Sequence, residues 1–454
     1  MPYIPHTAED TAAMLASIGA PDIHALFDEI PPALLHGELK NIPEGISEMA
    51  MLQHAHALAH QNQQGICFIG AGSYEHHIPA AVWDIASRGE FLTAYTPYQA
   101  EASQGTLQLL YEYQTMIAEL TGMAVANSSL YDGATALAEA VLMAVRINHH
   151  NESNRVLVVG TLHPLYREAL DTIVRNQHIE VLTLPFDLES GVTPMNALEQ
   201  YTGGDFTALV LVQPNFFGGL EQVDAMTDWA HANHIVTVAC VNPISLGVLK
   251  PPGLWGEKGV DIVCGEGQPF GSPMASGGPY FGFFSTRMQH VRQMPGRLIG
   301  RTLDKEGKVG FTLTLQAREQ HIRRGKAKSN ICTNQGLLVT AATIHMSLLG
   351  PQGLMDVAQR CHHNTHALVH ALTQIEGVTQ AFTAPYFHEA LLRLNKPVDA
   401  ILDCLHAAGI EGGYAIGSHF PALANTLLVC ATEMRTDDEI ARYAHALTAC
   451  MQQG

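Results

Sequence analysis

The chain has 454 residues, with 24 Lys and Arg against 43 Asp and Glu, which gives a formal net charge of −19. Hydrophobic residues make up 47% of the sequence, which excludes wholesale disorder, and so acidic a chain is not a non-specific nucleic-acid binder. The length is too great for one compact core and predicts two or three packed regions.

We expect a cytoplasmic protein that does not enter a membrane. No apolar run approaches the roughly 20 residues that span a bilayer, and the first residues lack the basic start and apolar core of a signal peptide. The 8 cysteines lie far apart, without a CxxC pair. They are therefore predicted to be free thiols in a reducing compartment rather than a disulfide framework.

The N-terminal region, residues 1–64, is predicted to be a helical arm. Apolar residues have helical spacing over Thr11–Ile18, and a short helix is expected over Ile23–Phe27, before two prolines break it. A further helix is expected from Pro43 to His60, with Ser47 as a possible N-cap.

From residue 65 the sequence takes on an α/β pattern. Short apolar runs that do not alternate with polar residues are typical of strands buried on both faces of a parallel sheet, with the intervening helices as crossovers. These runs are Arg155–Gly160, Val181–Leu184, Phe206–Gln213, His234–Cys240 and Ile262–Cys264. We predict a large α/β domain over 65–345 and, around the break at Gly350–Gly353, the start of a smaller α+β domain over 346–454.

Two polar segments are candidates for a binding site. The first follows a glycine pair and contains Ser73, Tyr74, His76 and His77. The second offers aromatic hydroxyls beside a rigid proline and leads into a helix expected over Thr106–Leu120, a combination that suits a pocket wall. Its candidate residues are Tyr95, Thr96, Tyr98 and Gln104. A solvated turn and an ordinary loop are the alternatives.

A hydroxyl-rich turn, Asn127–Ser129, opens an alanine-rich helix. Free N–H groups at such a helix start bind anions, and in enzymes that use pyridoxal phosphate (PLP) the phosphate would sit here. Simple N-capping explains the same residues equally well.

Two amides stand where a PLP enzyme of this architecture has charged groups. Asn242 follows one predicted strand, at the position of the Asp that pairs with the pyridine nitrogen, and Gln268 follows the next, at the position of the lysine that forms the Schiff base. A carboxamide cannot condense with an aldehyde, and no other lysine has a suitable position. The pattern of elements therefore indicates a PLP fold without its chemistry.

A basic segment contrasts with the acidic chain. Such a cluster can bind a carboxylate, a phosphate or an acidic partner. The alternative interpretation is a solvated helix face with ion pairs between neighbouring turns. Its residues are Arg297, Arg301, Arg318, His321, Arg323 and Arg324. His362, His366 and His370 share a helical face, but no acidic ligand stands in register, and we expect no metal there.

Several long motifs, in this order, resemble the alpha-type subunits of glycine decarboxylase, the P-protein of the glycine cleavage system, also called glycine dehydrogenase (aminomethyl-transferring) subunit 1. The resemblance covers essentially the whole chain. The motifs are Phe68–Pro79, Thr93–Gly105, Gly265–Gly271, Met294–Gly300, Arg318–Arg324 and Ser329–Gln335.

The resemblance implies PLP-dependent transferase fold type I, the aspartate aminotransferase superfamily, with a mostly parallel seven-stranded sheet. It also implies a homologous beta subunit that carries the Schiff-base lysine and PLP, in an α2β2 heterotetramer. Such complexes decarboxylate glycine and pass the aminomethyl group to the lipoyl arm of H-protein. Gln268 suits the alpha role, in which no PLP is bound covalently and no metal is expected.

In this fold the active site lies at the subunit interface. The resemblance therefore implies that the two polar segments line the partner's site and that the basic residues face the partner or H-protein. Two competing interpretations are a free-standing PLP enzyme of the aminotransferase or desulfurase kind, and a structural scaffold whose degenerate pocket contributes nothing.

Overall fold

The computed structural model describes residues 6–35, 41–62, 65–151 and 153–452. The chain divides into two compact units, Met1–Gln63 and Gln64–Gly454, which are described separately here.

The N-terminal unit consists of helices, as predicted: α1 (Ala8–Ile18), η1 (His24–Phe27), α2 (Pro32–Leu35) and α3 (Glu48–Ala59). Ser47 caps α3 by accepting a hydrogen bond from the Ala50 N–H at 3.3 Å. None of its helices has a buried residue, and apolar side chains such as Leu34 and Met49 are about 70% exposed. The described part of this unit therefore has no core of its own.

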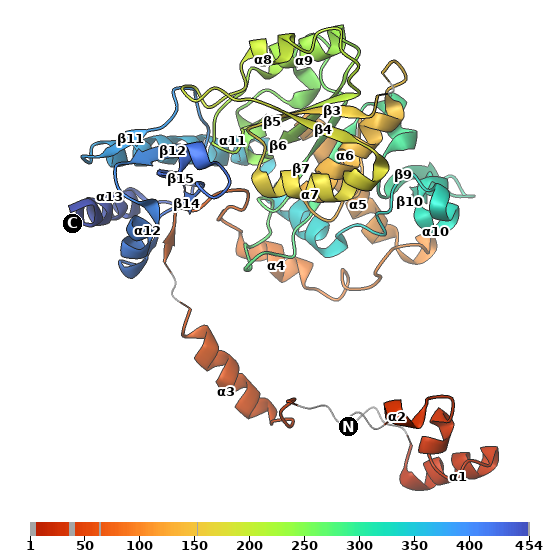
Figure 1. The fold of residues 1–454 in the computed structure, drawn as a ribbon. Helices are drawn as coiled ribbons and strands as arrows, with labels where there is room; N and C mark the ends of the chain where they lie inside the picture. The colour runs from red at the N-terminus through yellow and green to blue at the C-terminus, as the bar shows by residue number, and fades with distance from the viewer. Residues whose placement is uncertain (1–5, 36–40, 63–64, 152, 453–454) are drawn as a thin grey trace. The chain divides into compact units, whose positions relative to one another are not determined.

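A seven-stranded sheet forms the centre of the second unit (Figure 1). Its strands lie in the order β2-β8-β7-β6-β5-β3-β4, and only β8 runs against its neighbours. This confirms the predicted mostly parallel sheet. The strands are β2 (Val125–Ala126), β3 (Arg155–Val159), β4 (Glu180–Leu184), β5 (Ala208–Gln213), β6 (Val236–Val241), β7 (Ile262–Glu266) and β8 (Gly282–Thr286).

Helices connect and cover these strands. α6 packs across β5 to β8, α9 packs against β5 and β6, and α5 packs against β2, β8 and a hairpin of β9 and β10. One hydrophobic core joins these helices to the sheet. The bounds are α4 (Ala80–Ala86), α5 (Gln104–Thr121), α6 (Gly133–Ile147), α7 (Pro164–Val174), α8 (Met195–Glu199), α9 (Val223–Ala232), β9 (Leu298–Leu303), β10 (Val309–Thr314) and α10 (Gln320–Arg323).

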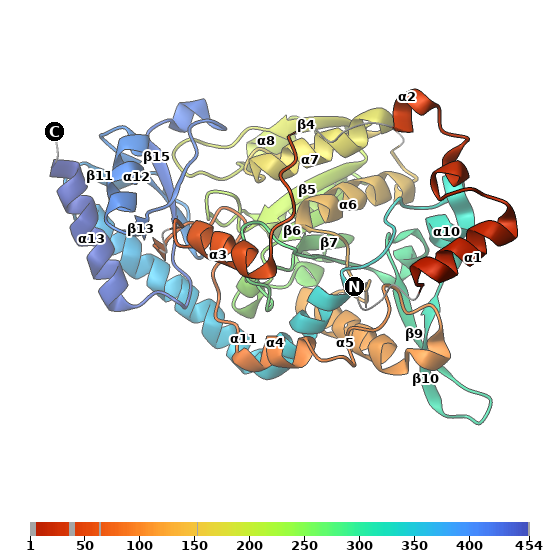
Figure 2. The same cartoon turned by 90° about the horizontal axis from the view of Figure 1, so that it is seen from below.

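The C-terminal part of the same unit has its own antiparallel sheet, in the order β11-β12-β15-β14, and a separate core (Figure 2). Its elements are β11 (Val378–Gln380), β12 (Glu389–Leu394), α12 (Val398–Ala407), β13 (Ile410–Glu411), β14 (Tyr414–Ala415), β15 (Thr426–Cys430) and α13 (Asp437–Gln452). β1 (Ile66–Cys67) pairs with β13, and Phe68 is buried in this C-terminal core. Residues 66–68, with which we expected the large domain to begin, therefore pack with the other end of the chain.

The helix α11 (Gly336–Thr373) connects the two parts and contains the 345/346 boundary that we predicted. It is broken at Gly350, whose φ of 60° is left-handed, as the glycines there suggested. Among the described residues this helix alone is long and apolar enough to cross a membrane, which the sequence reading did not anticipate. It packs against α4, α5 and α13, and many of its side chains lie in the two cores.

The prediction that the cysteines are all free thiols is wrong for one pair. Cys404 of α12 and Cys450 of α13 form a disulfide, with their Cα atoms 5.9 Å apart. The two helices pack side by side, which brings together cysteines that are 46 residues apart in the chain. Spacing along the sequence does not reveal this proximity.

Candidate functional site

A small cavity lies where the central strands of the large sheet end. The loops after β6 and β7 line it, together with His163, His388 and Glu389. Its volume is about 80 Å³. Pockets for small molecules are typically about 300–1,000 Å³, so this space is small for a cofactor.

Gln268 lies beside this cavity and is 1% exposed. Its Nε2 donates to the backbone oxygens of Tyr74 at 2.9 Å and Ser272 at 2.8 Å, and its Oε1 accepts from the Tyr74 N–H at 3.0 Å. The carboxamide thus uses both of its amide hydrogens and its oxygen to hold two loops together. It supplies no amine at the position where we predicted the Schiff-base lysine of a PLP enzyme.

Glu266, which the sequence analysis overlooked, occupies the start of α6. Its carboxyl oxygens accept hydrogen bonds from the N–H groups of Gly133 at 2.9 Å and Gln268 at 3.1 Å. Burial raises the pKa of Glu266 to about 8, although these backbone hydrogen bonds oppose the shift. A Cβ added at Gly133 would lie 2.3 Å from the Tyr166 hydroxyl. The helix start that would receive a phosphate is therefore filled by the chain itself.

The hydroxyl-rich turn before α6 does not form the anion site that was one of its two interpretations. Ser128 donates to the Arg297 carbonyl at 2.9 Å, and Asn127 donates to the Pro295 carbonyl at 3.1 Å. The helix is capped instead by Asp132, which accepts from the Thr135 N–H at 2.8 Å. The N-capping alternative therefore describes this helix start, with Asp132 as the cap.

Asn242 also makes local hydrogen bonds. Its Oδ1 accepts from the Ile244 N–H at 2.9 Å, and its Nδ2 lies 3.3 Å from Nε2 of His388. Burial lowers the pKa of His388 to about 3, so this imidazole is neutral and accepts that hydrogen bond. No charge is available here to hold a pyridine nitrogen protonated.

These residues do not fit PLP. The cavity lining contains no lysine, Asn242 is uncharged, and Glu266 takes the place of the phosphate. Covalent PLP chemistry therefore has no anchor among the residues that line this cavity.

The first polar segment, residues 73–77, is partly internal. Tyr74 is buried and donates to Glu389 at 2.8 Å, and Ser73 lies 2.8 Å from the Tyr280 hydroxyl. Burial raises the pKa of Glu389 to about 7, against its hydrogen bonds from Ala71 and Tyr74. His76 is buried too, and only the His77 side chain is exposed.

In the second polar segment, two tyrosines face outward. Tyr95 is 80% exposed and Tyr98 is 51% exposed. Thr96 is buried against Thr333, and the Gln104 amide joins α5 to β10 by hydrogen bonds with both backbone groups of Phe311. Tyr95, Tyr98, Gln104 and His77 are thus the predicted partner-facing residues that are exposed.

A family model described as glycine cleavage system P-protein matches residues 1–447. A Legionella pneumophila (strain Lens) protein named probable glycine dehydrogenase (decarboxylating) subunit 1 is 72% identical over 453 residues, covering 100% of this chain and 99% of that protein. The chain belongs to the P-protein family.

Solved structures agree with this assignment. A crystal structure of glycine decarboxylase (P-protein), in inhibitor-bound form, is 42% identical with a TM-score of 0.91, covering 99% of this chain and 100% of that one. A mutant enzyme with glycine covalently linked to its PLP cofactor shares the fold, at 16% identity and a TM-score of 0.62, covering 87% and 98% of the two chains. This P-protein chain therefore has the PLP fold type I architecture that we predicted.

The basic segment of this P-protein chain is divided between interior and surface. Arg297 is 2% exposed, pairs with Glu319 at 3.2 Å and donates to the Tyr98 hydroxyl at 2.8 Å. Arg318 is buried and donates to the backbone oxygens of Met294, Gly296 and Leu315. Both guanidinium groups support loops, and Arg318 also lines a cavity together with the exposed Arg323.

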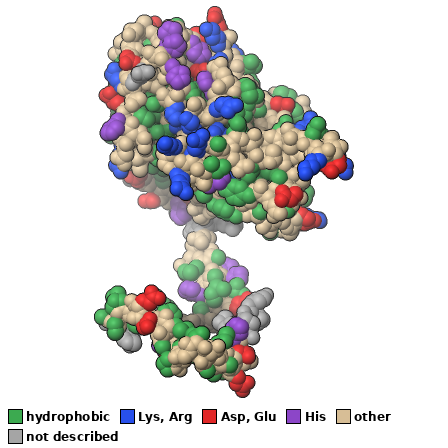
Figure 3. Space-filling view, turned by 90° about the vertical axis from the view of Figure 1, so that its right-hand side faces the viewer, with side chains coloured by type: hydrophobic (Ala, Val, Ile, Leu, Met, Phe, Trp, Pro, Cys, Tyr) green, Lys and Arg blue, Asp and Glu red, His purple; other side chains and the backbone are tan. Residues whose placement is uncertain are grey.

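The remaining basic residues lie at the surface. Arg301, His321, Arg323 and Arg324 are exposed. Figure 3 shows Lys and Arg side chains gathered on one face of the molecule. Arg323 lines a cavity of about 330 Å³ whose other basic residues are Arg292, Arg318, Lys326 and Lys328. Arg292 and the two lysines were not among the predicted site residues.

The histidines of α11 are held by local contacts. His362 Nδ1 lies 3.1 Å from the Phe387 carbonyl oxygen, and the His366 ring stacks on Tyr386 with centroids 4.2 Å apart. The described group of side chains that could hold a metal lies elsewhere, at His76, Cys361 and Glu433.

Proposed function

We propose that this chain is the alpha subunit (subunit 1) of a glycine dehydrogenase (decarboxylating) and that it works only together with a homologous beta subunit. In this proposal the beta subunit carries the lysine and PLP. The complex releases CO2 from glycine and transfers the aminomethyl group to the lipoyl arm of H-protein. One observation carries the proposal: in a chain of the P-protein family the carboxamide of Gln268, which we place at the position of the cofactor's lysine, is buried and fully hydrogen-bonded.

Co-expression with the beta subunit tests the proposal. The purified complex is expected to release CO2 from labelled glycine in the presence of lipoylated H-protein, with PLP bound to the beta subunit. The alpha subunit alone is expected to hold no covalent PLP and to show no turnover. An alpha subunit that consumes glycine alone would contradict the proposal, and sedimentation of the complex tests the α2β2 stoichiometry.

We assign Tyr95 and His77 to the wall of the partner's active site. Tyr95 is 80% exposed and lies two residues before the rigid Pro97, so its hydroxyl is available to a partner that covers this loop. Tyr95→Phe and His77→Ala are expected to lower turnover of the assembled complex and to leave assembly intact. Tyr201→Phe is a matched control because Tyr201 packs against Phe206, with ring centroids 5.2 Å apart. Unchanged rates in both variants would favour the scaffold interpretation.

We assign the exposed basic cavity to an acidic surface of H-protein. Arg292, Arg323, Lys326 and Lys328 bring four positive charges to one cavity of a chain whose net charge is −19. Such a site attracts a negatively charged partner at a distance and loses that attraction in salt.

Charge reversal tests this assignment. Arg323→Glu is expected to raise the KM for H-protein about tenfold at low salt and less at high salt. Arg360→Glu, on the exposed side of α11, makes the same change of charge outside the cavity and is expected to have a smaller effect. Equal effects of the two variants would contradict the assignment.

A further inference from the structure

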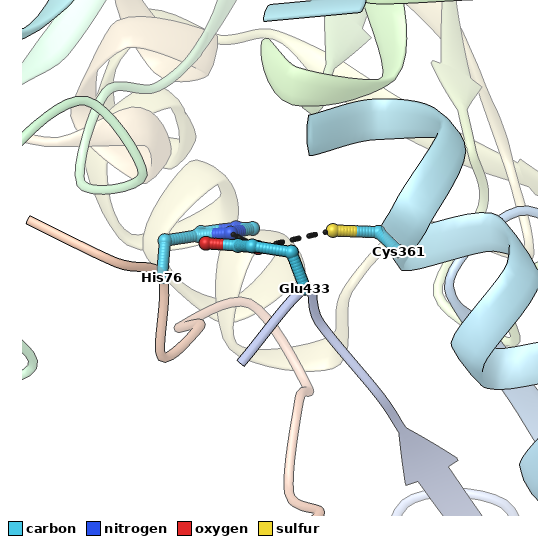
Figure 4. A group of neighbouring side chains, drawn as sticks. All are labelled: His76, Cys361 and Glu433. Carbon is cyan, nitrogen blue, oxygen red and sulfur yellow. Dashed lines mark hydrogen bonds and ion pairs between the residues drawn. The ribbon is translucent and has the colours of Figure 1, made fainter. Parts of the chain in front are cut away.

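Three side chains that are far apart in the sequence meet in the second unit (Figure 4). His76 comes from the loop after β1, Cys361 from α11 and Glu433 from the loop after β15. Oε2 of Glu433 lies 2.7 Å from Nδ1 of His76 and accepts a hydrogen bond from the Cys361 thiol at 3.2 Å. The potential ligand atoms of the three residues all lie within 4.8 Å of one another.

The donor set suits one kind of metal ion. Imidazole, thiolate and carboxylate together are ligands of zinc, whereas magnesium and calcium take oxygen ligands. We propose that His76, Cys361 and Glu433 form a zinc site that joins the segment 73–77 to α11 and to the C-terminal core. This site is separate from the histidines of α11 that the sequence drew attention to, and it does not depend on the proposed function.

The geometry is close to that of a bound ion. Zinc–ligand bonds of about 2.0–2.3 Å in a tetrahedral arrangement put neighbouring ligand atoms about 3.3–3.5 Å apart. Oε2 of Glu433 would therefore move away from His76 by about 0.6 Å and from Cys361 by a few tenths of an ångström, shifts that side-chain rotation supplies.

The surroundings support the cluster. Oε1 of Glu433 accepts a hydrogen bond from the His77 N–H at 2.7 Å, which fixes the carboxylate in the way that outer partners orient metal ligands. Nε2 of His76 is buried without a hydrogen-bond partner among the described residues, so neither ring nitrogen of His76 is committed to a contact outside the cluster. The Glu433 side chain is 13% exposed, which leaves a route from solvent.

Zinc binding displaces a proton from the cluster. In the metal-free cluster the Cys361 thiol carries its proton and donates it in a hydrogen bond to the Glu433 carboxylate. Zinc binding releases this proton, so that the thiolate, an imidazole nitrogen and the carboxylate bind Zn²⁺. No oxidant or reductant is needed.

Cobalt titration of the full chain tests the proposal. The chain is stripped with a chelator, kept reduced and titrated with Co²⁺, whose spectrum shows a thiolate-to-metal charge-transfer band only when sulfur is a ligand. We expect one Co²⁺ per chain with this band, its loss when Zn²⁺ is added, and a rise in the melting temperature with either metal.

Variants assign the ligands. Cys361→Ser should abolish the band and weaken zinc binding. Loss of a residue that only supports a metal ligand weakens binding by roughly 10–100-fold, so loss of a ligand should weaken it at least as much. Cys332→Ser removes an exposed thiol and His366→Ala removes an α11 histidine, and both should bind as the wild type does. If Cys361→Ser fails to fold, Glu433→Gln keeps the shape and the thiol and should bind Zn²⁺ at least about tenfold more weakly, and an unchanged zinc affinity in this variant would contradict the proposal.

Two results would overturn the proposal. The first is a wild-type chain that shows no charge-transfer band with Co²⁺. The second is a band that persists in Cys361→Ser or disappears in Cys332→Ser, since metal would then be bound by another thiol.

Discussion

Replacing Gln268 with lysine supplies an amine at the position that we assign to the Schiff-base lysine, yet we predict that Gln268→Lys alone does not give tight PLP binding. The start of α6, where the phosphate would bind, is occupied by the Glu266 carboxyl group through hydrogen bonds of 2.9 and 3.1 Å. A phosphate can enter only if this group leaves.

The cost of moving Glu266 can be worked out from its contacts. Two hydrogen bonds are lost at about 0.5–1.5 kcal/mol each, and a displaced carboxyl group without partners costs a further 1–3 kcal/mol or so. A total of about 2–6 kcal/mol corresponds to a PLP affinity that is about 30- to 25,000-fold weaker than in an open site. The double variant Gln268→Lys with Glu266→Ser removes the obstructing group and should gain that factor.

The assay is a PLP titration followed by absorbance, then borohydride reduction and peptide mass spectrometry to find PLP on residue 268. Thermal unfolding of both variants checks that they fold, because Gln268 also accepts a hydrogen bond from the Tyr74 N–H. If Gln268→Lys alone binds PLP as tightly as the double variant, Glu266 does not block the site and the reasoning is refuted.

Three further predictions concern stability. The raised pKa of Glu266 means that the native chain holds a proton that the unfolded chain, with its ordinary value of 4.5, releases. This proton stabilises the native chain fully below pH 4.5, and the stabilisation, up to about 5 kcal/mol, is lost as the pH rises to about 8. Urea unfolding over that pH range should therefore show a smaller loss of unfolding free energy for Glu266→Gln than for the wild type. Cys404→Ser should lower the unfolding free energy under oxidising conditions by about 4 kcal/mol, because the disulfide closes a loop of 46 residues, and should have no such effect in the presence of reductant. Asp132→Ala should cost about 1 kcal/mol in urea unfolding, because the N-cap of α6 is lost, and a cost near zero would show that another group caps the helix.

The sequence predicts the large sheet well because its strands are continuous apolar runs buried on both faces. Each of the five runs from Arg155 to Cys264 became a strand of the parallel part of the sheet. Local capping chemistry also predicts helix ends, as at Ser47. These features depend on residues that are close together in the chain.

The features that the sequence did not reveal depend on contacts between distant residues. Glu266 was not among the predicted site residues, because only the approach of α6 brings the Gly133 N–H to its carboxyl group. The sequence groups Arg297 with other basic residues as a binding cluster, yet Arg297 is buried, where it pairs with Glu319 and donates to the Tyr98 hydroxyl. His76 and Glu433 are 357 positions apart, and no local pattern relates them.

The pairing of β1 with β13 affects the order in which the chain is completed during synthesis. Ile66 leaves the ribosome early, but its partner Ile410 follows only after a further 344 residues (410 − 66). At about 5–20 residues per second, the first strand waits roughly 17–70 s for its neighbour. The large sheet can assemble during that interval, whereas the C-terminal core closes last and holds the two ends of the second unit together.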